Sequence, residues 1–585
     1  MTESPPPEAS RLRLWPALVI VAMAAFAVFA VPLLVESRSP VHFYGKAGGL
    51  VGGPMLLLVW WLTVARATGL FRWLPAFLFA IPAAAFIAFI YGKAAFNVLL
   101  FGCSFVALVW LVWLVIHRLF GLGGLRISVY LVILAGWAAF GLVRIDQTDS
   151  EVWPEIRWAW SKTEEERFLA ERAENNPPPV PTAAEANGNV VKVLPGDVPS
   201  FRGVNLDGRV VGLKPKSDDW SASPPKLVWK HRIGPGWGTF SIADGKLFTQ
   251  EQRGPNECVI CYDATAGTEL WEAAEPARFY EGIAGAGPRG TPTIQDGKLY
   301  SQGATGMLQC LDAATGRVKW KTNITADSGG VVPPWGYAGS PLIADDKVIV
   351  YTGAPGGKGT SAFSVYDGKL LWAAGDATHG YSSAQLADFG GVRQVLMLSD
   401  AGLESFAPAD GKRLWFFEWA NKFNRATQPA ILDESSVLIS TGVGPDQGSK
   451  RLKVTRKADG TFEVKVAWEA RRPRAYFNDG VVHKGHFYGF DDKSLVCVDL
   501  AEGKLKWNAG AIYGHGQVLL LSDADRLVVL SDRGQAALVA AEPEGYSELG
   551  KFPALKGKTW NHPVAAHGKL YLRNGEEAAC YDLEK

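Results

Sequence analysis

Two stretches of the chain, CYDATAGTELW (residues 261–271) and CLDAATGRVKW (residues 310–320), share one pattern that decides the fold. In each, alternating apolar and polar residues run into a glycine turn, and a tryptophan follows the glycine four residues later. FAPADGKRLW (406–415) and CVDLAEGKLKW (497–507) repeat the pattern. A period in the forties is typical of repeat architectures. The tryptophans that mark it are Trp229, Trp271, Trp320, Trp372, Trp415, Trp468 and Trp507.

Each period also contains a second element, a pair of short alternating segments joined by a turn. TPTIQDGKLYSQG (291–303) and SPLIADDKVIVYTG (340–353) are examples, and such patterns predict β-hairpins. Four short strands per period without a helical stretch predict the blade of a β-propeller. Counting hairpins predicts eight blades, of which the seventh, within residues 527–552, lacks its tryptophan.

The two ends of the repeat region complement each other. The segment AACYDLEK (578–585) matches the third strand of a blade, and no tryptophan-bearing strand follows it. A strand of the missing type, PPKLVWK (224–230), precedes the first hairpin. We therefore expect the early strand to complete the last blade, because closing the ring removes exposed sheet edges.

The N-terminal part is a membrane module by composition. Its apolar runs contain no charged side chain and are long enough, or nearly so, to cross a bilayer as helices. The last has only 17 residues, so the count is four or five, with five favoured. The first run is too long for a signal-peptide core and reads as an uncleaved anchor. The runs are Leu14–Val35, Ala47–Ala65, Trp73–Ile90, Ala95–Ile116 and Ile127–Val143.

The orientation follows from Lys and Arg near the ends of the runs. With the N-terminus inside, six basic residues lie on the cytoplasmic side and four on the other, which places the soluble body outside the cytoplasm. No charge lies at mid-depth, so the runs read as an anchor rather than an ion path. The cytoplasmic set is Arg11, Arg13, Arg66, Arg72, Arg118 and Arg126, and the other is Arg38, Lys46, Lys93 and Arg144.

The division into parts follows the composition. Residues 1–12 are expected to be a cytoplasmic tail, and 13–144 a transmembrane module of about five helices. Residues 145–195 hold an interfacial amphipathic helix and a Pro/Ala-rich linker, and 196–585 the eight-bladed propeller. Residues 145–585 carry 49 basic and 55 acidic side chains, so this part is not basic and nucleic-acid binding is not expected.

The cysteines support the repeat. Cys261, Cys310, Cys497 and Cys580 occupy one repeat position in different blades, so we expect them to stay unpaired as core fillers. Cys258 and Cys261 form a CxxC, but residues three apart on a strand face opposite ways. No metal site is therefore assigned.

The motifs ATAGTELW and AATGRVKW resemble the AxTGxxxW signature of the pyrroloquinoline-quinone (PQQ) type repeat. The resemblance covers about residues 196–585. It implies a fold shared by eight-bladed quinoprotein dehydrogenases and the lipoprotein propeller of the outer-membrane barrel-assembly machine. The segment VPSFRGVNLDG (198–208) also looks like PQQ-like propellers of planctomycete-type bacteria, and the five spans resemble those of membrane-bound glucose dehydrogenases. Fold alone does not imply activity.

A propeller binds ligands where its inner strands begin, and the residues just before those strands form an aromatic and cationic ring. Such a ring suits a planar or anionic ligand through stacking and charge-assisted hydrogen bonds. The alternative is that these residues only plug the channel and hold the blade tops. The predicted ring is Trp237, Arg289, Tyr337, Tyr381, Arg425, Tyr476, Asn478, His515, Trp560 and His562.

The leading hypothesis is a non-catalytic binding or scaffold module for a protein, glycan or small ligand. It is tethered to the bacterial inner membrane by its helices in the lipid bilayer, with the propeller in the periplasm and an envelope protein or glycan as possible partner. No catalytic residue and no cofactor are assigned. The alternative is a PQQ-dependent sugar or alcohol dehydrogenase that passes electrons to membrane quinone. That reading needs calcium, and only Asp479 and Glu281 are candidate acids near the ring.

Overall fold

The structure is a computed structural model that describes residues 12–35, 40–91, 97–121, 125–148, 153–174, 190–421, 425–444 and 446–584. The chain divides into two compact units, which are described separately. The first comprises Met1–Ser161 with the short loop Tyr280–Gly285, and the second comprises Lys162–Phe279 and Ala286–Lys585. Part of the predicted linker, residues 175–189, lies outside the described residues.

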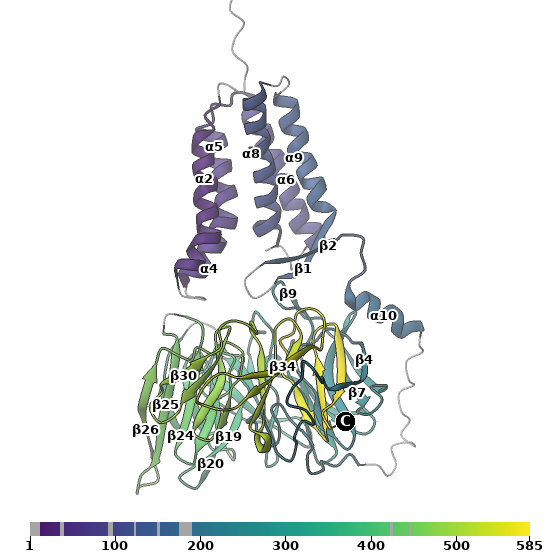
Figure 1. The fold of residues 1–585 in the computed structure, drawn as a ribbon, viewed down its shortest axis with the longest axis vertical. Coiled ribbons are helices and arrows are strands. Elements are labelled where there is room, and N and C mark those ends of the chain that lie inside the picture. Colours follow the sequence, from purple (N-terminus) through teal and green to yellow (C-terminus); the bar gives the residue numbers. More distant parts are fainter. Residues whose placement is uncertain are drawn as a thin grey trace, which may run out of the picture. The chain divides into compact units, whose positions relative to one another are not determined.

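The first unit is helical (Figure 1). Four helical segments are long and apolar enough to cross a membrane: Trp15–Leu34, Tyr44–Thr63, Leu70–Ala88 and Val98–Phe120. A fifth helix, α9 (Leu125–Gly141), is apolar but shorter, with 17 residues. The prediction of four or five apolar helices is confirmed. The segments are built from α2 (Trp15–Ala25), η1 (Phe26–Ala30), α3 (Val31–Leu34), α4 (Pro40–Ala47), η2 (Gly48–Gly52), α5 (Gly53–Thr63), α6 (Leu70–Ala85), η3 (Phe86–Tyr91), η5 (Val98–Gly102) and α8 (Cys103–Phe120).

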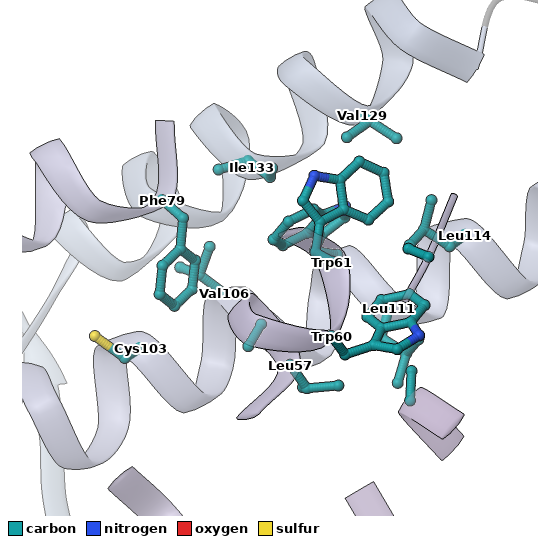
Figure 2. Close-up of a cluster of buried hydrophobic side chains, with 14 of the residues drawn as sticks. Leu57, Trp60, Trp61, Phe79, Cys103, Val106, Leu111, Leu114, Val129 and Ile133 are labelled. Carbon is teal, nitrogen blue, oxygen red and sulfur yellow. The ribbon is translucent and has the colours of Figure 1, made fainter. Parts of the chain in front are cut away.

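Aromatic side chains fill the centre of this unit (Figure 2). Trp61 of α5 is fully buried and makes edge contacts with Phe71 and Trp110, at ring-centroid distances of 5.2 and 4.9 Å. Gly49 allows two helical segments to approach, because a Cβ there would lie 2.6 Å from Cγ2 of Val28. Shape-matched packing of this kind is what holds helices together where lipid tails offer no hydrophobic drive.

A β-hairpin follows α9, at the start of the segment for which the sequence predicted an interfacial helix. Strand β1 (Val143–Thr148) pairs antiparallel with β2 (Pro154–Trp158), with Ile145 opposite Ile156. Pro154 cannot donate within a helix, which favours an extended start to the second strand. The predicted helix is present only as α10 (Glu164–Glu174).

The second unit contains eight β-sheets, confirming the eight-bladed propeller of four-stranded antiparallel blades (Figure 1). Blade 7 has a fifth strand, because β3 (Arg209–Val210) pairs parallel with its inner strand. Blades 1 to 4 are β5 (Ser241–Ala243), β6 (Lys246–Arg253), β7 (Asn256–Asp263), β8 (Glu269–Pro276); β11 (Thr293–Gln295), β12 (Lys298–Gln302), β13 (Met307–Asp312), β14 (Val318–Asn323); β15 (Leu342–Ala344), β16 (Lys347–Ala354), β17 (Lys358–Ser364), β18 (Leu370–Ala374); and β19 (Gln385–Phe389), β20 (Val392–Leu398), β21 (Gly402–Phe406), β22 (Arg413–Glu418). Blades 5 to 8 are β23 (Ala430–Asp433), β24 (Ser436–Thr441), β25 (Gly448–Arg456), β26 (Phe462–Ala470); β27 (Val481–His483), β28 (His486–Asp491), β29 (Ser494–Asp499), β30 (Leu505–Asn508); β31 (Gln517–Leu521), β32 (Arg526–Leu530), β33 (Gln535–Ala540), β34 (Glu548–Pro553); and β35 (Val564–Ala566), β36 (Lys569–Arg573), β37 (Glu577–Asp582), β4 (Lys226–Arg232).

The ring is closed as predicted, because β4, which precedes the first hairpin in the chain, completes the last blade. It pairs antiparallel with β37, with Trp229 opposite Cys580 and Leu227 opposite Tyr581. Val228 lies between these pairs at a bulge. Because β4 and β37 come from the two ends of the repeat region, their pairing leaves no open sheet edge where the ring closes.

The tryptophan–glycine signature is the joint between neighbouring blades. The Trp271 indole of blade 1 donates a 3.2 Å hydrogen bond to the Ala313 carbonyl of blade 2. Its ring also packs on Gly316, where a Cβ would lie 2.5 Å away and φ is +72°. Both features explain why glycine stands at this turn. The same Trp–Gly contact is made by Trp229 with Gly267, Trp320 with Gly368, Trp372 with Gly411 and Trp468 with Gly503.

Three joints depart from this rule. Trp507 of blade 6 donates to the Glu542 carbonyl at 2.7 Å, but none of the described glycines packs on its ring. Trp415 of blade 4 donates to the Gln394 side chain of its own blade, at 2.6 Å, and Gly460 of blade 5 has nothing within 4 Å of a built Cβ. In blade 7 the tryptophan position is Gly550, because Gly550 pairs with Leu538 as Trp320 pairs with Cys310.

A tryptophan from outside the blades replaces the missing one. Trp220 lies in the segment before β4 and is 1 % exposed. It stacks edge-on against Phe552 at 5.6 Å within the hydrophobic cluster shared by blades 7 and 8. A Cβ on Gly550 would lie 2.5 Å from the Trp220 backbone nitrogen, so the absent side chain makes room for this segment.

The six cysteines are buried and unpaired. Cys258 belongs to the cluster between blades 8 and 1, and Cys261 to the cluster between blades 1 and 2. The two sulfurs of the CxxC thus face opposite sides of one sheet, as the strand geometry predicts.

Helix α10 packs on blade 1 of the propeller. Thr163 caps it, since the Glu166 N–H donates to Thr163 Oγ1 at 2.9 Å and the Thr163 N–H to the Glu166 carboxylate at 2.7 Å. Arg172 reaches Glu269 at 2.7 Å, and Arg253 lies 5.2 Å from the Phe168 ring centroid. A partly buried ion network therefore fixes the helix to the propeller.

Candidate functional site at the propeller channel

The predicted ring residues lie in the eight segments that lead into the inner strands β5, β11, β15, β19, β23, β27, β31 and β35. The structure separates them by their contacts. Some form one aromatic cluster, some contact the blade tops, and His562 lies beside Asp479. Asn478 is buried, and its side-chain amide donates to the Gly516 carbonyl at 2.5 Å.

An aromatic cluster spans the mouth from blade 1 to blade 6. Trp560 contacts Trp237 at 5.5 Å and Phe477 at 5.2 Å, and Phe477 contacts Tyr476 at 5.0 Å and His515 at 5.8 Å. All except His515 are partly exposed. The cluster therefore presents ring faces and edges that a planar ligand can stack on.

A lysine adds a cation to this cluster. The Lys558 ammonium lies 4.6 Å from the Trp560 ring centroid and 5.4 Å from that of Trp237. Sequence reasoning missed Phe477 and Lys558, although each lies within two residues of a predicted ring member. Tryptophan faces hold the charge close to the rings by cation–π attraction.

Four of the predicted ring residues make contacts within the blade tops. Tyr337 is buried, and its hydroxyl donates to the Thr352 carbonyl at 3.1 Å. The Arg425 guanidinium stacks 4.5 Å over Trp419, and burial lowers its pKa to about 10. Tyr381 contacts Trp335 at 5.3 Å, and the half-buried Arg289 lies 4.5 Å over Phe279. Tyr337 and Arg425 are thus held inside the blade tops, whereas Arg289 remains partly exposed.

The channel itself holds a buried charged group formed by Arg202, Asp479 and His562. The Asp479 carboxylate lies 3.6 Å from His562 Nε2 and 3.9 Å from Arg202 Nη1, and it accepts the Gln428 N–H at 2.6 Å. Burial raises the pKa of Asp479 and lowers that of His562 well below its usual range. His562 is therefore neutral near pH 7, and Arg202 supplies the positive charge.

Arg202 belongs to a segment that crosses the channel. Val198 forms a β-bridge with Ile242 of blade 1, Arg202 Nη2 donates to the Gly480 carbonyl of blade 6 at 2.6 Å, and β3 pairs with β31 of blade 7. The signal for it in the sequence was VPSFRGVNLDG, whose Phe201 contacts His562 at 5.0 Å. The segment therefore links blades 1, 6 and 7.

A cavity of about 480 Å³ opens beside this segment, among blades 4, 5 and 6. Its walls include Leu386, Ile431 and Phe487, and its rim carries more carboxylates than arginines. The charged lining residues are Arg202, Arg209, Asp207, Asp388, Asp433, Glu434 and Asp479. The bulge of β23 between Ile431 and Asp433 lies at this place.

The donor atoms of the site do not fit a calcium–PQQ centre. Calcium takes several carboxylate or carbonyl oxygens together. Asp479 is engaged by Gln428 and Arg202, and the Glu281 carboxylate accepts the Ile283 and Ala284 N–H groups at 2.7 Å each. Among the described residues no group of three or more His, Cys, Asp or Glu could hold a metal ion.

Comparisons with known proteins agree with the repeat. Residues 255–509 match the family described as outer membrane protein assembly factor BamB. BamB of Yersinia pestis is 21 % identical over 274 residues, 42 % of this chain and 64 % of that protein. Quinohemoprotein alcohol dehydrogenase ADH-IIG of Pseudomonas putida is 25 % identical over 210 residues, 31 % of this chain and 28 % of that protein. The chain thus spans less than two thirds of either relative.

Two solved structures show low similarity to this chain. BamB from Moraxella catarrhalis gives a TM-score of 0.46 at 14 % identity, covering 61 % of this chain and 99 % of that one. Quinohemoprotein alcohol dehydrogenase from Comamonas testosteroni gives 0.47 at 13 % identity, covering 72 % and 84 %. By the family match and the two sequence relatives, the second unit is a PQQ-like propeller similar to BamB and to quinoprotein dehydrogenases.

Proposed function

We propose that this PQQ-like propeller is a membrane-tethered binding module that takes a planar, anionic ligand at its channel mouth. The observation that carries the proposal is the partly exposed cluster of Trp237, Trp560, Phe477 and Tyr476 with Lys558 above the indoles. The rings supply stacking area, and the ammonium supplies a charge-assisted hydrogen bond to an anion. Similarity to BamB supports an envelope protein partner as a further ligand.

The tether places the propeller in the periplasm of a bacterium under this proposal. Arg13, Arg66, Arg72, Arg118 and Arg126 lie at the helix ends that would face the cytoplasm. With α9 counted as a fifth span, the positive-inside rule then puts the propeller on the other side of the inner membrane. Protease digestion of the full chain in spheroplasts checks this: loss of the propeller supports it, and full protection contradicts it.

A PQQ-dependent dehydrogenase is the second candidate, favoured by the similarity to ADH-IIG. Such an enzyme would need the cofactor's calcium, and the donor atoms near Asp479 do not provide its ligands. Measuring PQQ binding and dye reduction on one protein therefore separates the two functions.

The test uses the full chain in detergent or lipid nanodiscs, with PQQ itself as the planar anionic probe. We expect binding that does not require calcium and gives no dye reduction with sugars or alcohols. Lys558→Gln and Trp560→Ala should each weaken binding about tenfold, the value of one cation–π or stacking contact. Lys551→Gln is the matched control, since Lys551 lies on the outer strand β34.

Three outcomes are informative. Calcium-dependent binding with dye reduction would establish the dehydrogenase. If Lys558→Gln and Trp560→Ala leave the affinity for PQQ unchanged, the ligand does not bind at the channel mouth. Failure of PQQ to bind at millimolar concentration would contradict a site for planar anions.

A further inference from the structure

A cavity of about 760 Å³ lies at one end of the helical unit and is lined by three arginines and apolar side chains. Every described residue of its lining belongs to this unit. Its lining residues are Leu12, Arg13, Leu14, Trp15, Leu18, Arg66, Val115, Arg118 and Leu119.

The antiparallel run of the helices brings the three arginines together. Arg13 precedes α2, Arg66 follows α5 with φ of +65°, and Arg118 lies in the last turn of α8. Two hydrogen bonds join these helix ends. The Trp60 indole donates to the Arg13 carbonyl at 3.0 Å, and Arg118 Nη1 donates to the Leu12 carbonyl at 3.3 Å. The cluster is therefore part of the helix packing.

The described residues that line the cavity include no acidic side chain. Three guanidinium groups around one space favour an anion in it. Guanidinium groups bind phosphate oxygens in a bidentate way, which suits a phosphate better than a single carboxylate.

The rest of the lining is apolar, and three of its side chains face outward. Trp15 is 70 % exposed, Leu18 50 % and Leu119 74 %. Contact with lipid acyl chains would remove these side chains from water, which is favourable. A free phosphate ion would leave them in water. Basic pockets between helices on the cytoplasmic side are suited to anionic lipid headgroups.

We propose that this cavity binds the phosphate of an anionic phospholipid, with the acyl chains along Trp15, Leu18 and Leu119. The inference rests on the proposed membrane tether and goes beyond it, because a tether needs no particular lipid. The bound lipid would join the ends of three helices, α2, α5 and α8, and so stabilise the unit.

Native mass spectrometry of the full chain in detergent tests the proposal by titration with cardiolipin, phosphatidylglycerol and phosphatidylcholine. We expect the two anionic lipids to bind at least about tenfold more tightly than phosphatidylcholine, as several arginines near the phosphate imply. Arg66→Gln should weaken cardiolipin about fivefold, and the R66Q/R118Q pair about 25-fold. Arg126→Gln is the matched control, because Arg126 is not among the lining residues and its guanidinium lies 5.7 Å over Phe71.

Equal affinity for the three lipids would overturn the inference, and so would an equal loss in Arg126→Gln. Displacement of cardiolipin by millimolar inorganic phosphate would show a phosphate site without lipid specificity, which also contradicts it. Because binding is measured in detergent, it is separate from the spheroplast digestion that tests the tether. Arg66→Lys keeps the charge and should recover most of the affinity, which a folding defect would not.

Discussion

Gly316 shows how one residue type is required by both its own backbone and its neighbour. Its φ is +72°, and a Cβ would lie 2.5 Å from the Trp271 ring. Gly460 has a similar φ of +86°, but nothing lies within 4 Å of its built Cβ. The two glycines therefore separate the cost of the backbone conformation from the cost of the clash.

We expect Gly316→Ala to destabilise the propeller by about 2–5 kcal/mol, the sum of left-handed backbone strain and overpacking. Gly460→Ala should cost only the backbone part, about 1–2 kcal/mol. Denaturant unfolding followed by tryptophan fluorescence measures both. Equal losses would show that the Trp271 contact adds nothing at this joint.

Glu257 predicts a pH dependence of stability. It is 6 % exposed, and burial raises its pKa from 4.5 to about 7 despite hydrogen bonds from Ala304 and Thr305. A carboxyl whose pKa rises on folding favours the folded state below the unfolded value, and that advantage is lost as pH rises to about 7. The Glu257→Gln variant should therefore gain stability relative to the parent between pH 4.5 and 7.

The gain amounts to no more than about 3 kcal/mol. Thermal unfolding of both proteins at pH 5 and pH 8 tests it. Glu502→Gln serves as control, because the Glu502 side chain is 61 % exposed. A stability difference between Glu257→Gln and the parent that stays constant from pH 5 to pH 8 would contradict the raised pKa of Glu257.

At the scale of elements, Trp220 takes the role of a blade tryptophan from outside the blades. Trp220→Ala should cost about 3–5 kcal/mol, the usual price of removing a buried tryptophan. Trp160→Ala, at a side chain 68 % exposed, should change stability by less than about 0.5 kcal/mol. In Trp220→Ala, hydrogen exchange should become faster first in β34 and β35. Unchanged exchange in these strands would contradict the role of Trp220.

The elements that the sequence predicted are those with a local period. Strands, blade count, the missing seventh tryptophan and the pairing of Leu227 with the Cys580 stretch followed from repeating residues. Trp220, Arg202 and Lys558 were not predicted, because each acts at a single place, with no repeat to reveal it. The hairpin of β1 and β2 was missed since its two strands are short and read as part of an interfacial segment.

The candidate ring was only partly foreseeable. A position just before each inner strand could be read from the sequence, but the direction of each side chain could not. Arg425 turns toward Trp419 and the Ser399 carbonyl, whereas Trp560 meets Trp237 and Phe477. These choices depend on contacts between loops of different blades.

At the scale of the whole molecule, ring closure predicts how fragments behave. Residues 162–585 contain the complete propeller with α10 and should fold as a soluble monomer. Residues 233–585 lack β4, so β37 has an open edge and the fragment should aggregate. Residues 214–585 keep β4 and Trp220 without the segment that crosses the channel, and should remain closed but less stable.

Size-exclusion chromatography and circular dichroism distinguish the three fragments. A monodisperse, folded fragment 233–585 would mean that β4 is dispensable for closure.

The order in which the chain is made gives the pairing of β4 with β37 a further consequence. Strand β4 leaves the ribosome before every strand of blades 1 to 6, and its partner β37 is the last strand to leave. During synthesis β4 must wait while seven blades form, and it is exposed to mispairing with any strand that passes. Biogenesis of this protein should therefore depend on factors that shield one early strand until translation is complete.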